Sequence, residues 1–136
     1  MKTEAAILVS TTKPLEIVDI EIPTLKQGQV LIELYFSGIC GTQLMEIDGK
    51  KGRDIWLPHC LGHEGIGKVV EKHSSVSKVK IDDTVVLSWI KGPGIEAGGT
   101  KYKWGQSSVN AGSITTFQKF AVISENRITK YATKKS

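Results

Sequence analysis

Three residues of metal-binding type flank the strongly apolar segments of the chain. Cys40 follows one apolar run, and His63 and Glu64 stand together just before another. A thiolate, an imidazole and a carboxylate together suit zinc, and a three-ligand set leaves one coordination position open for chemistry. Isolated cysteines and histidines are also common as packed residues, so the spacing alone leaves both interpretations open.

A second histidine and a second cysteine, His59 and Cys60, stand close to this pair. His59 and His63 are four positions apart, a spacing that a helix would place on one face. Pro58 and Gly62 argue against a helix here. We therefore interpret His59 as a loop residue and Cys60 as a core thiol.

A glycine-rich stretch, GPGIEA at residues 92–97, matches the relaxed dinucleotide-binding fingerprint. That fingerprint works only when a helix N-terminus follows and points at the pyrophosphate. Gly98 and Gly99 follow instead, and the rest of the chain has the pattern of strands. We interpret the stretch as a glycine-rich loop.

The elements that must position these residues are mostly strands. Period-two alternation or short apolar runs predict strands at residues 5–9, 15–22, 30–36, 65–70, 84–89, 115–123 and 127–131. Residues 40–47 predict one short helix, which ends at Gly49. Residues 90–112 show no sustained period and predict a long loop. Together, these strands, the short helix and the loop predict a mainly β, partly open barrel.

Composition limits the function classes. The 136 residues fit one domain, and a net charge of +4 without clustered basic residues argues against nucleic-acid binding. Two cysteines are too few for a disulfide scaffold, which indicates a reducing, cytoplasmic compartment. Apolar runs fall far short of the roughly 20 residues that span a bilayer, so no membrane segment is expected.

Two motifs resemble those of the zinc-dependent medium-chain alcohol dehydrogenase family. They are SGICGT at residues 37–42 and LPHCLGHEGIG at residues 57–67. The resemblance extends to residues 14–18 and 76–87, and only the glycine-rich loop lies outside it. It implies the N-terminal GroES-like catalytic domain of that family, as a single partly open β-barrel over residues 1–136.

The resemblance also implies the roles of individual residues. Positions matching Cys40 and His63 bind the catalytic zinc in the family, and the position matching Glu64 is an adjacent or exchanging ligand. Thr42 matches the hydroxyl that passes on the proton of the substrate alcohol.

Two tryptophans, Trp56 and Trp89, match places near the substrate pocket. Packing of each ring in the core is an equal alternative.

The chain also departs from the family. Members carry a dinucleotide-binding domain that binds NAD(P), and their chain then returns to complete the catalytic domain. The third zinc ligand usually comes from the part of the family's chain that has no counterpart in residues 1–136. A cysteine-free stretch, residues 91–112, stands where many members have a four-cysteine structural-zinc lobe. We therefore expect weak or partial zinc occupancy and no NAD(P) binding by residues 1–136.

These features together predict part of an oxidoreductase. We expect the catalytic-domain portion of an enzyme that acts on a small alcohol or polyol with a nicotinamide cofactor, inactive on its own. The alternatives are a non-catalytic GroES-like binding module and one half of a split dehydrogenase. The expected partners are a second copy of the chain or a separate dinucleotide-binding chain.

Overall fold

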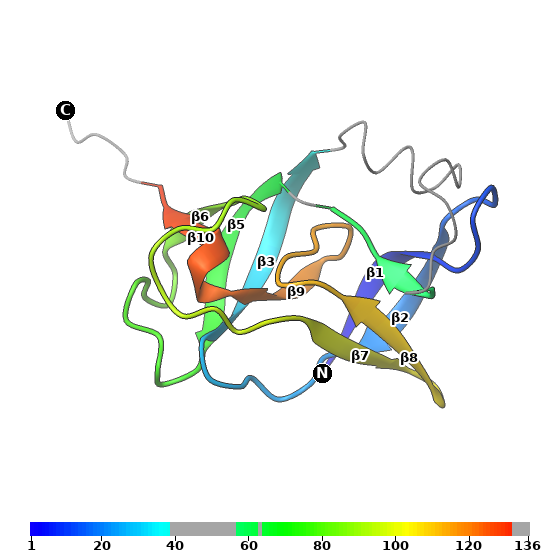
Figure 1. Cartoon of the computed structure of the whole chain (residues 1–136), viewed down its shortest axis with the longest axis horizontal. Helices are drawn as coiled ribbons and strands as arrows, with labels where there is room; N and C mark the ends of the chain where they lie inside the picture. Colours follow the sequence, from blue (N-terminus) through cyan, green and yellow to red (C-terminus); the bar gives the residue numbers. More distant parts are fainter. Residues whose placement is uncertain (39–56, 63, 132–136) are drawn as a thin grey trace.

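The computed structural model describes residues 1–38, 57–62 and 64–131, and for His59 the backbone only. The strands form two sheets (Figure 1). The first contains β1 (Lys2–Leu8), β2 (Glu16–Glu21), β4 (His59–Cys60), β7 (Thr100–Trp104) and β8 (Ser107–Ala111). The second contains β3 (Gln29–Gly38), β5 (Glu64–Lys72), β6 (Thr84–Leu87), β9 (Phe120–Ser124) and β10 (Ile128–Lys130), with the 3-10 helix η1 (Glu125–Arg127) before β10.

The first sheet forms a barrel with short ladders. Its pairings run from β1 through β2, β7, β8 and β4 back to β1. Two of these contacts consist of a single residue pair, Glu21 with Lys103 and His59 with Asn110. Because the ring is hydrogen-bonded so sparsely at these points, the barrel is partly open. The predicted mainly β, partly open barrel is confirmed.

Strands β3 and β9 lie between two hydrophobic cores. Val30 and Ile123 are paired and face the core of the second sheet, whereas Leu31 and Val122 are paired and face the barrel core. A strand buried on both faces requires a continuous apolar run rather than alternation. The sequence VLI at the start of β3 and AVI in β9 meet that requirement.

The prediction of a long loop over residues 90–112 is wrong for its second half. Residues 100–111 form the β7–β8 hairpin. Tyr102 lies in the barrel core, while Lys101 and Lys103 are exposed. This alternation of buried and exposed residues is a strand signal, but the surrounding glycines obscure it.

The strand predicted over residues 115–123 is shorter than expected, because only its second half forms β9. The backbone N–H groups of Thr116 and Phe117 both donate to the carbonyl oxygen of Leu61, at 3.0 and 3.1 Å. These donors are therefore not available to a ladder. The helix predicted over residues 40–47 lies outside the described residues.

A β-bulge interrupts the pairing of β3 with β5. Leu34 pairs with Gly67 and Phe36 pairs with Ile66, so Tyr35 is an extra residue on β3. A bulge bends its strand and changes the direction of the following side chains. In this chain it precedes the end of β3.

No helix in the described part of the chain is long and apolar enough to cross a membrane.

Candidate functional site

Glu64 and Gly38 meet at one edge of the second sheet. Glu64 begins β5 and Gly38 ends β3, and the two residues are paired across the ladder. A β-carbon on Gly38 would lie 3.3 Å from Oε2 of Glu64, so the carboxylate lies over the glycine. Glu64 is exposed, and its carboxylate is therefore accessible from solvent.

The glycines around Glu64 allow neighbouring segments to approach closely. A β-carbon on Gly62, where φ is +105°, would lie 2.7 Å from the backbone nitrogen of Thr116. One on Gly65 would lie 2.7 Å from the carbonyl oxygen of Phe36. The hydroxyls of Thr116 and Ser37 are 2.7 Å apart. The motif therefore lets β5 pack tightly against β3 and against the segment before β9.

An open groove of about 380 Å³ lies at this edge, with Glu64 and Ser88 among its polar residues. Its apolar residues include a row across three strands, in which Phe36 pairs with Ile66 and Ile66 pairs with Val86. Their side chains are 72%, 39% and 36% exposed. The edge thus combines a carboxylate with an exposed apolar surface.

Four of the predicted site residues, Cys40, Thr42, Trp56 and His63, lie outside the described residues. Their roles therefore stay predictions.

Trp89 follows β6 and is 58% exposed. Its carbonyl oxygen accepts a hydrogen bond of 2.7 Å from Nη1 of Arg127. Packing of Trp89 in the core, one of its two interpretations, is therefore wrong. Its ring is also not part of the lining of the groove beside Glu64.

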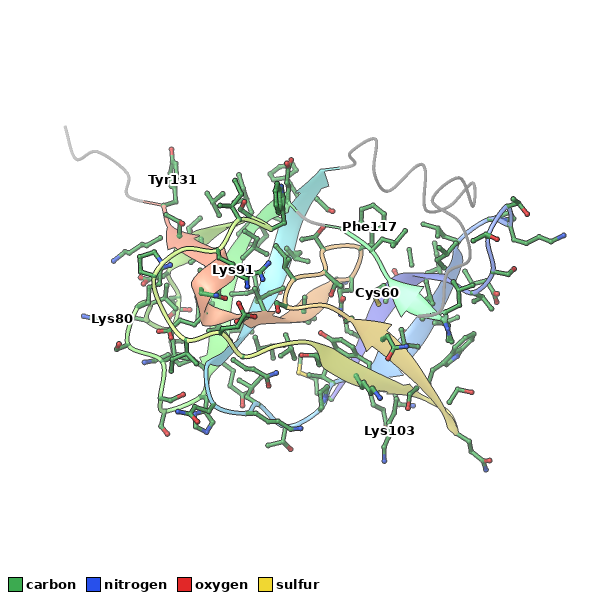
Figure 2. The ribbon with its side chains drawn as sticks, in the orientation of Figure 1. Cys60, Lys80, Lys91, Lys103, Phe117 and Tyr131 are labelled. Atoms are coloured by element: carbon green, nitrogen blue, oxygen red, sulfur yellow. The ribbon has the colours of Figure 1, made fainter. Side chains whose placement is uncertain are left out.

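Cys60 lies on β4 (Figure 2) and is 4% exposed, in the barrel core with Tyr102 and Val109. Burial raises the pKa of the Cys60 thiol to about 12. The thiolate, which is the form that binds metals, is therefore rare at neutral pH. The core-thiol interpretation of Cys60 is confirmed.

Within residues 1–38, 57–62 and 64–131, no three His, Cys, Asp or Glu side chains gather into a metal-binding group.

The glycine-rich stretch at residues 92–97 contains no helix, as predicted. Glu125, which no sequence motif indicates, holds this loop. The side chain of Glu125 is almost fully buried and accepts the backbone N–H of Ile95 at 2.8 Å. It also accepts the N–H groups of Ser77 and Lys78, at 3.2 and 3.1 Å. No local pattern around Glu125 identifies these distant partners.

A second carboxylate, Glu96, belongs to this loop and binds residues outside it. It accepts from Nδ2 of Asn126 at 2.6 Å and from Oγ of Ser113 at 2.9 Å. These two hydrogen bonds, helped by the charge of Arg127, lower the pKa of Glu96 to about 2. The loop is therefore anchored to η1 and to the connection between β8 and β9.

The sequence matches a known domain family and known proteins. The sequence model of the family described as "Alcohol dehydrogenase GroES-like domain" matches residues 26–133. The S-(hydroxymethyl)glutathione dehydrogenases of Escherichia coli O1:K1 and Shigella sonnei are 41% identical over 86 residues. The match covers 63% of this chain but only 23% of each enzyme.

Solved structures show the same fold. An alcohol dehydrogenase zinc-binding domain protein from Burkholderia ambifaria has a TM-score of 0.81 and 21% identity, over 97% of this chain and 42% of that one. Benzyl alcohol dehydrogenase from Acinetobacter calcoaceticus has a TM-score of 0.75 and 21% identity, over 100% of this chain and 42% of that one. The chain therefore belongs to the alcohol dehydrogenase GroES-like domain family.

Proposed function

We propose that this chain is the catalytic-domain portion of a zinc-dependent alcohol dehydrogenase-type oxidoreductase. The complete enzyme would move a hydride between an alcohol or polyol carbon and a nicotinamide cofactor. The observation that carries the proposal is the pairing of Gly38 with Glu64 at the groove.

Chain connectivity supports a metal site at this edge. Cys40 is two residues from Gly38 and His63 is one residue from Glu64 along the chain. Each step between consecutive Cα atoms spans about 3.8 Å. Ligands from the end of β3 and the start of β5 can therefore converge.

The donor set suits the metal that the family uses. A thiolate from Cys40 and an imidazole from His63 would hold zinc, with Glu64 as an adjacent ligand. Zinc would supply Lewis-acid chemistry, which lowers the pKa of an alcohol. The hydroxyl of Thr42 would accept the alcohol proton and pass it on.

The cofactor would be bound outside residues 1–136. Hydride transfer needs the reacting atoms about 3–3.5 Å apart, which requires a rigid dinucleotide site. Residues 92–97, which match the relaxed dinucleotide fingerprint, are followed by no helix that could receive a pyrophosphate. We therefore propose that residues 1–136 form one GroES-like domain that is inactive without a dinucleotide-binding domain, in the same polypeptide or in a partner.

Metal analysis tests the zinc proposal. We expect the dialysed protein to retain less than one equivalent of zinc, and Cys40→Ser to lower that amount. Cys60→Ala is the matched control and should leave the zinc content unchanged, because Cys60 lies in the barrel core. A Cys40→Ser protein that retains as much zinc as the unaltered protein would contradict the assignment.

Calorimetric titration with oxidised and reduced nicotinamide cofactors tests the proposal that the cofactor binds outside residues 1–136. We expect no measurable binding to residues 1–136 and no oxidation of alcohols at any zinc concentration. Micromolar binding would show that these residues contain a cofactor site, and residues 91–112 would be the first place to search for it.

A second candidate function is a non-catalytic module that binds another copy of the chain. The exposed row of Phe36, Ile66 and Val86 favours it. On β5, Glu64 and Lys68 stand two positions before and after Ile66, on the same face. A two-fold related copy would place Glu64 opposite Lys68, so the surface is complementary to itself.

Light scattering separates the two candidates. A dimer that Ile66→Lys dissociates, together with no cofactor binding in the presence of a dinucleotide-binding partner, would favour the binding module. A monomer at high concentration would contradict it.

A further inference from the structure

A pocket outside the candidate zinc site lies between the β2–β3 connection and the start of β7. Its volume is about 340 Å³, and it is more enclosed than the groove beside Glu64. Lys26 and Gln29 line it from one side, and Thr100 and Lys101 line it from the other.

The side chain of Gln29 joins the two walls. Gln29 is 4% exposed, and the backbone N–H of Lys26 donates to its Oε1 at 2.8 Å. Because a backbone N–H can only donate, this bond fixes which end of the amide is the oxygen. Nε2 therefore faces Thr100 and donates to its Oγ1 at 3.1 Å. A buried hydrogen bond therefore joins the two walls of the pocket.

This bridge leaves spare donor capacity at two polar atoms. Oγ1 of Thr100 accepts from Gln29, so its own proton is left to donate, and Thr100 is 7% exposed. Nε2 of Gln29 carries a second hydrogen as well. Neither hydrogen has an acceptor among the residues that the structure describes. Each atom already makes one hydrogen bond, and an acceptor placed in the pocket would use its remaining hydrogen.

The charge of the pocket has one sign. Lys26 and Lys101 are the charged residues of its lining, and both are exposed. Neither ammonium group forms an ion pair with a carboxylate in the described ranges. A pocket with two cations and two spare neutral donors, and without an acidic side chain, selects an anion rather than a metal ion.

We propose that this pocket binds a small oxyanion, a phosphate or carboxylate group of a small molecule. Gln29 and Thr100 would donate to its oxygens, and Lys26 and Lys101 would neutralise its charge. The site is separate from the zinc edge, so it does not depend on the proposed oxidoreductase function.

An NMR titration with sodium phosphate at constant ionic strength tests the proposal. We expect saturable shifts of the Gln29 side-chain amide and of the Thr100 backbone amide. Lys26→Gln and Lys101→Gln should each weaken binding about two- to fivefold, as exposed charge pairs do. Lys103→Gln is the matched control: it removes the same charge from the same exposed face of β7, but Lys103 lies outside the pocket.

A parallel titration with succinate identifies the source of the oxyanion. Binding of phosphate alone assigns a phosphate group, and binding of succinate alone assigns a carboxylate. Two results would overturn the proposal: no saturable shift with either anion, or a loss in Lys103→Gln as large as in Lys101→Gln. The second result would mean that anion binding depends on the net charge of the protein and not on the residues of the pocket.

Discussion

Gly62 lies directly against Thr116, with φ of +105° and no room for a β-carbon. In Gly62→Ala, the new methyl group would press on the backbone of Thr116, and the φ angle would be strained as well. We expect the free energy of unfolding to fall by about 2–4 kcal/mol, as measured by urea denaturation.

Gly98→Ala is the control for the φ effect. Gly98 also has a positive φ, +74°, but nothing lies within 4 Å of the position that a β-carbon would take there. Its substitution should cost only the left-handed backbone penalty, about 1 kcal/mol. Equal losses in the two variants would show that the contact with Thr116 does not contribute.

Glu125→Gln should destabilise the protein through the loop that Glu125 holds. An amide keeps one acceptor oxygen, whereas the carboxylate accepts from Ile95, Ser77 and Lys78 with both oxygens. We expect a loss of about 1–3 kcal/mol in unfolding free energy, because buried N–H groups lose their acceptor. Glu71→Gln, an exposed position on β5, should change stability little. A Glu125→Gln protein as stable as Glu71→Gln would contradict this role.

Glu96 should make stability depend on pH in the acid range. Its pKa is about 2 in the folded protein against 4.5 for an unperturbed Glu, so the unfolded state binds the proton more readily. The stabilisation by the carboxylate is therefore complete above pH 4.5 and is lost as the pH falls through about 2. Denaturation series at several pH values should show that the unaltered protein and Glu96→Gln converge between those limits. A difference in unfolding free energy between the two proteins that stays constant with pH would argue against the prediction.

Cys60 should react slowly with thiol reagents while the protein is folded. Its pKa of about 12, against 9.0 for a free thiol, makes the reactive thiolate scarce, and the side chain is buried. In a Cys40→Ser variant at pH 8, we expect reaction with a disulfide dye to be about 100-fold slower in buffer than in urea. Similar rates in both conditions would show that the barrel core opens to the reagent.

Part of the fold can be predicted from local pattern. The run at the start of β3 and the alternation in β2 are strong signals over consecutive residues, so both strands are predicted. The β7–β8 hairpin has a comparable signal in Tyr102 flanked by Lys101 and Lys103, but the glycines before it conceal where the strand begins. Pattern fails where a short strand follows a glycine-rich loop.

The candidate site can be predicted only in part, for a different reason. The motif around Glu64 indicates the strand edge, because its glycines and carboxylate are neighbours in the sequence. The bridge from Gln29 to Thr100 and the bonds from Glu125 to Ile95 join segments far apart along the chain. Such pairs depend on the complete tertiary fold, and no local periodicity encodes them.

The extra residue at Tyr35 determines which residues at the end of β3 pair with the start of β5. Leu34 pairs with Gly67 and Phe36 with Ile66, so the unpaired Tyr35 keeps the residues after it in register with β5. Deleting Ser37, which follows the bulge, would move Gly38 opposite Gly65, and the carboxylate of Glu64 would lose the neighbour whose missing side chain leaves it room. The number of residues between the bulge and the end of β3 thus decides what stands beside Glu64.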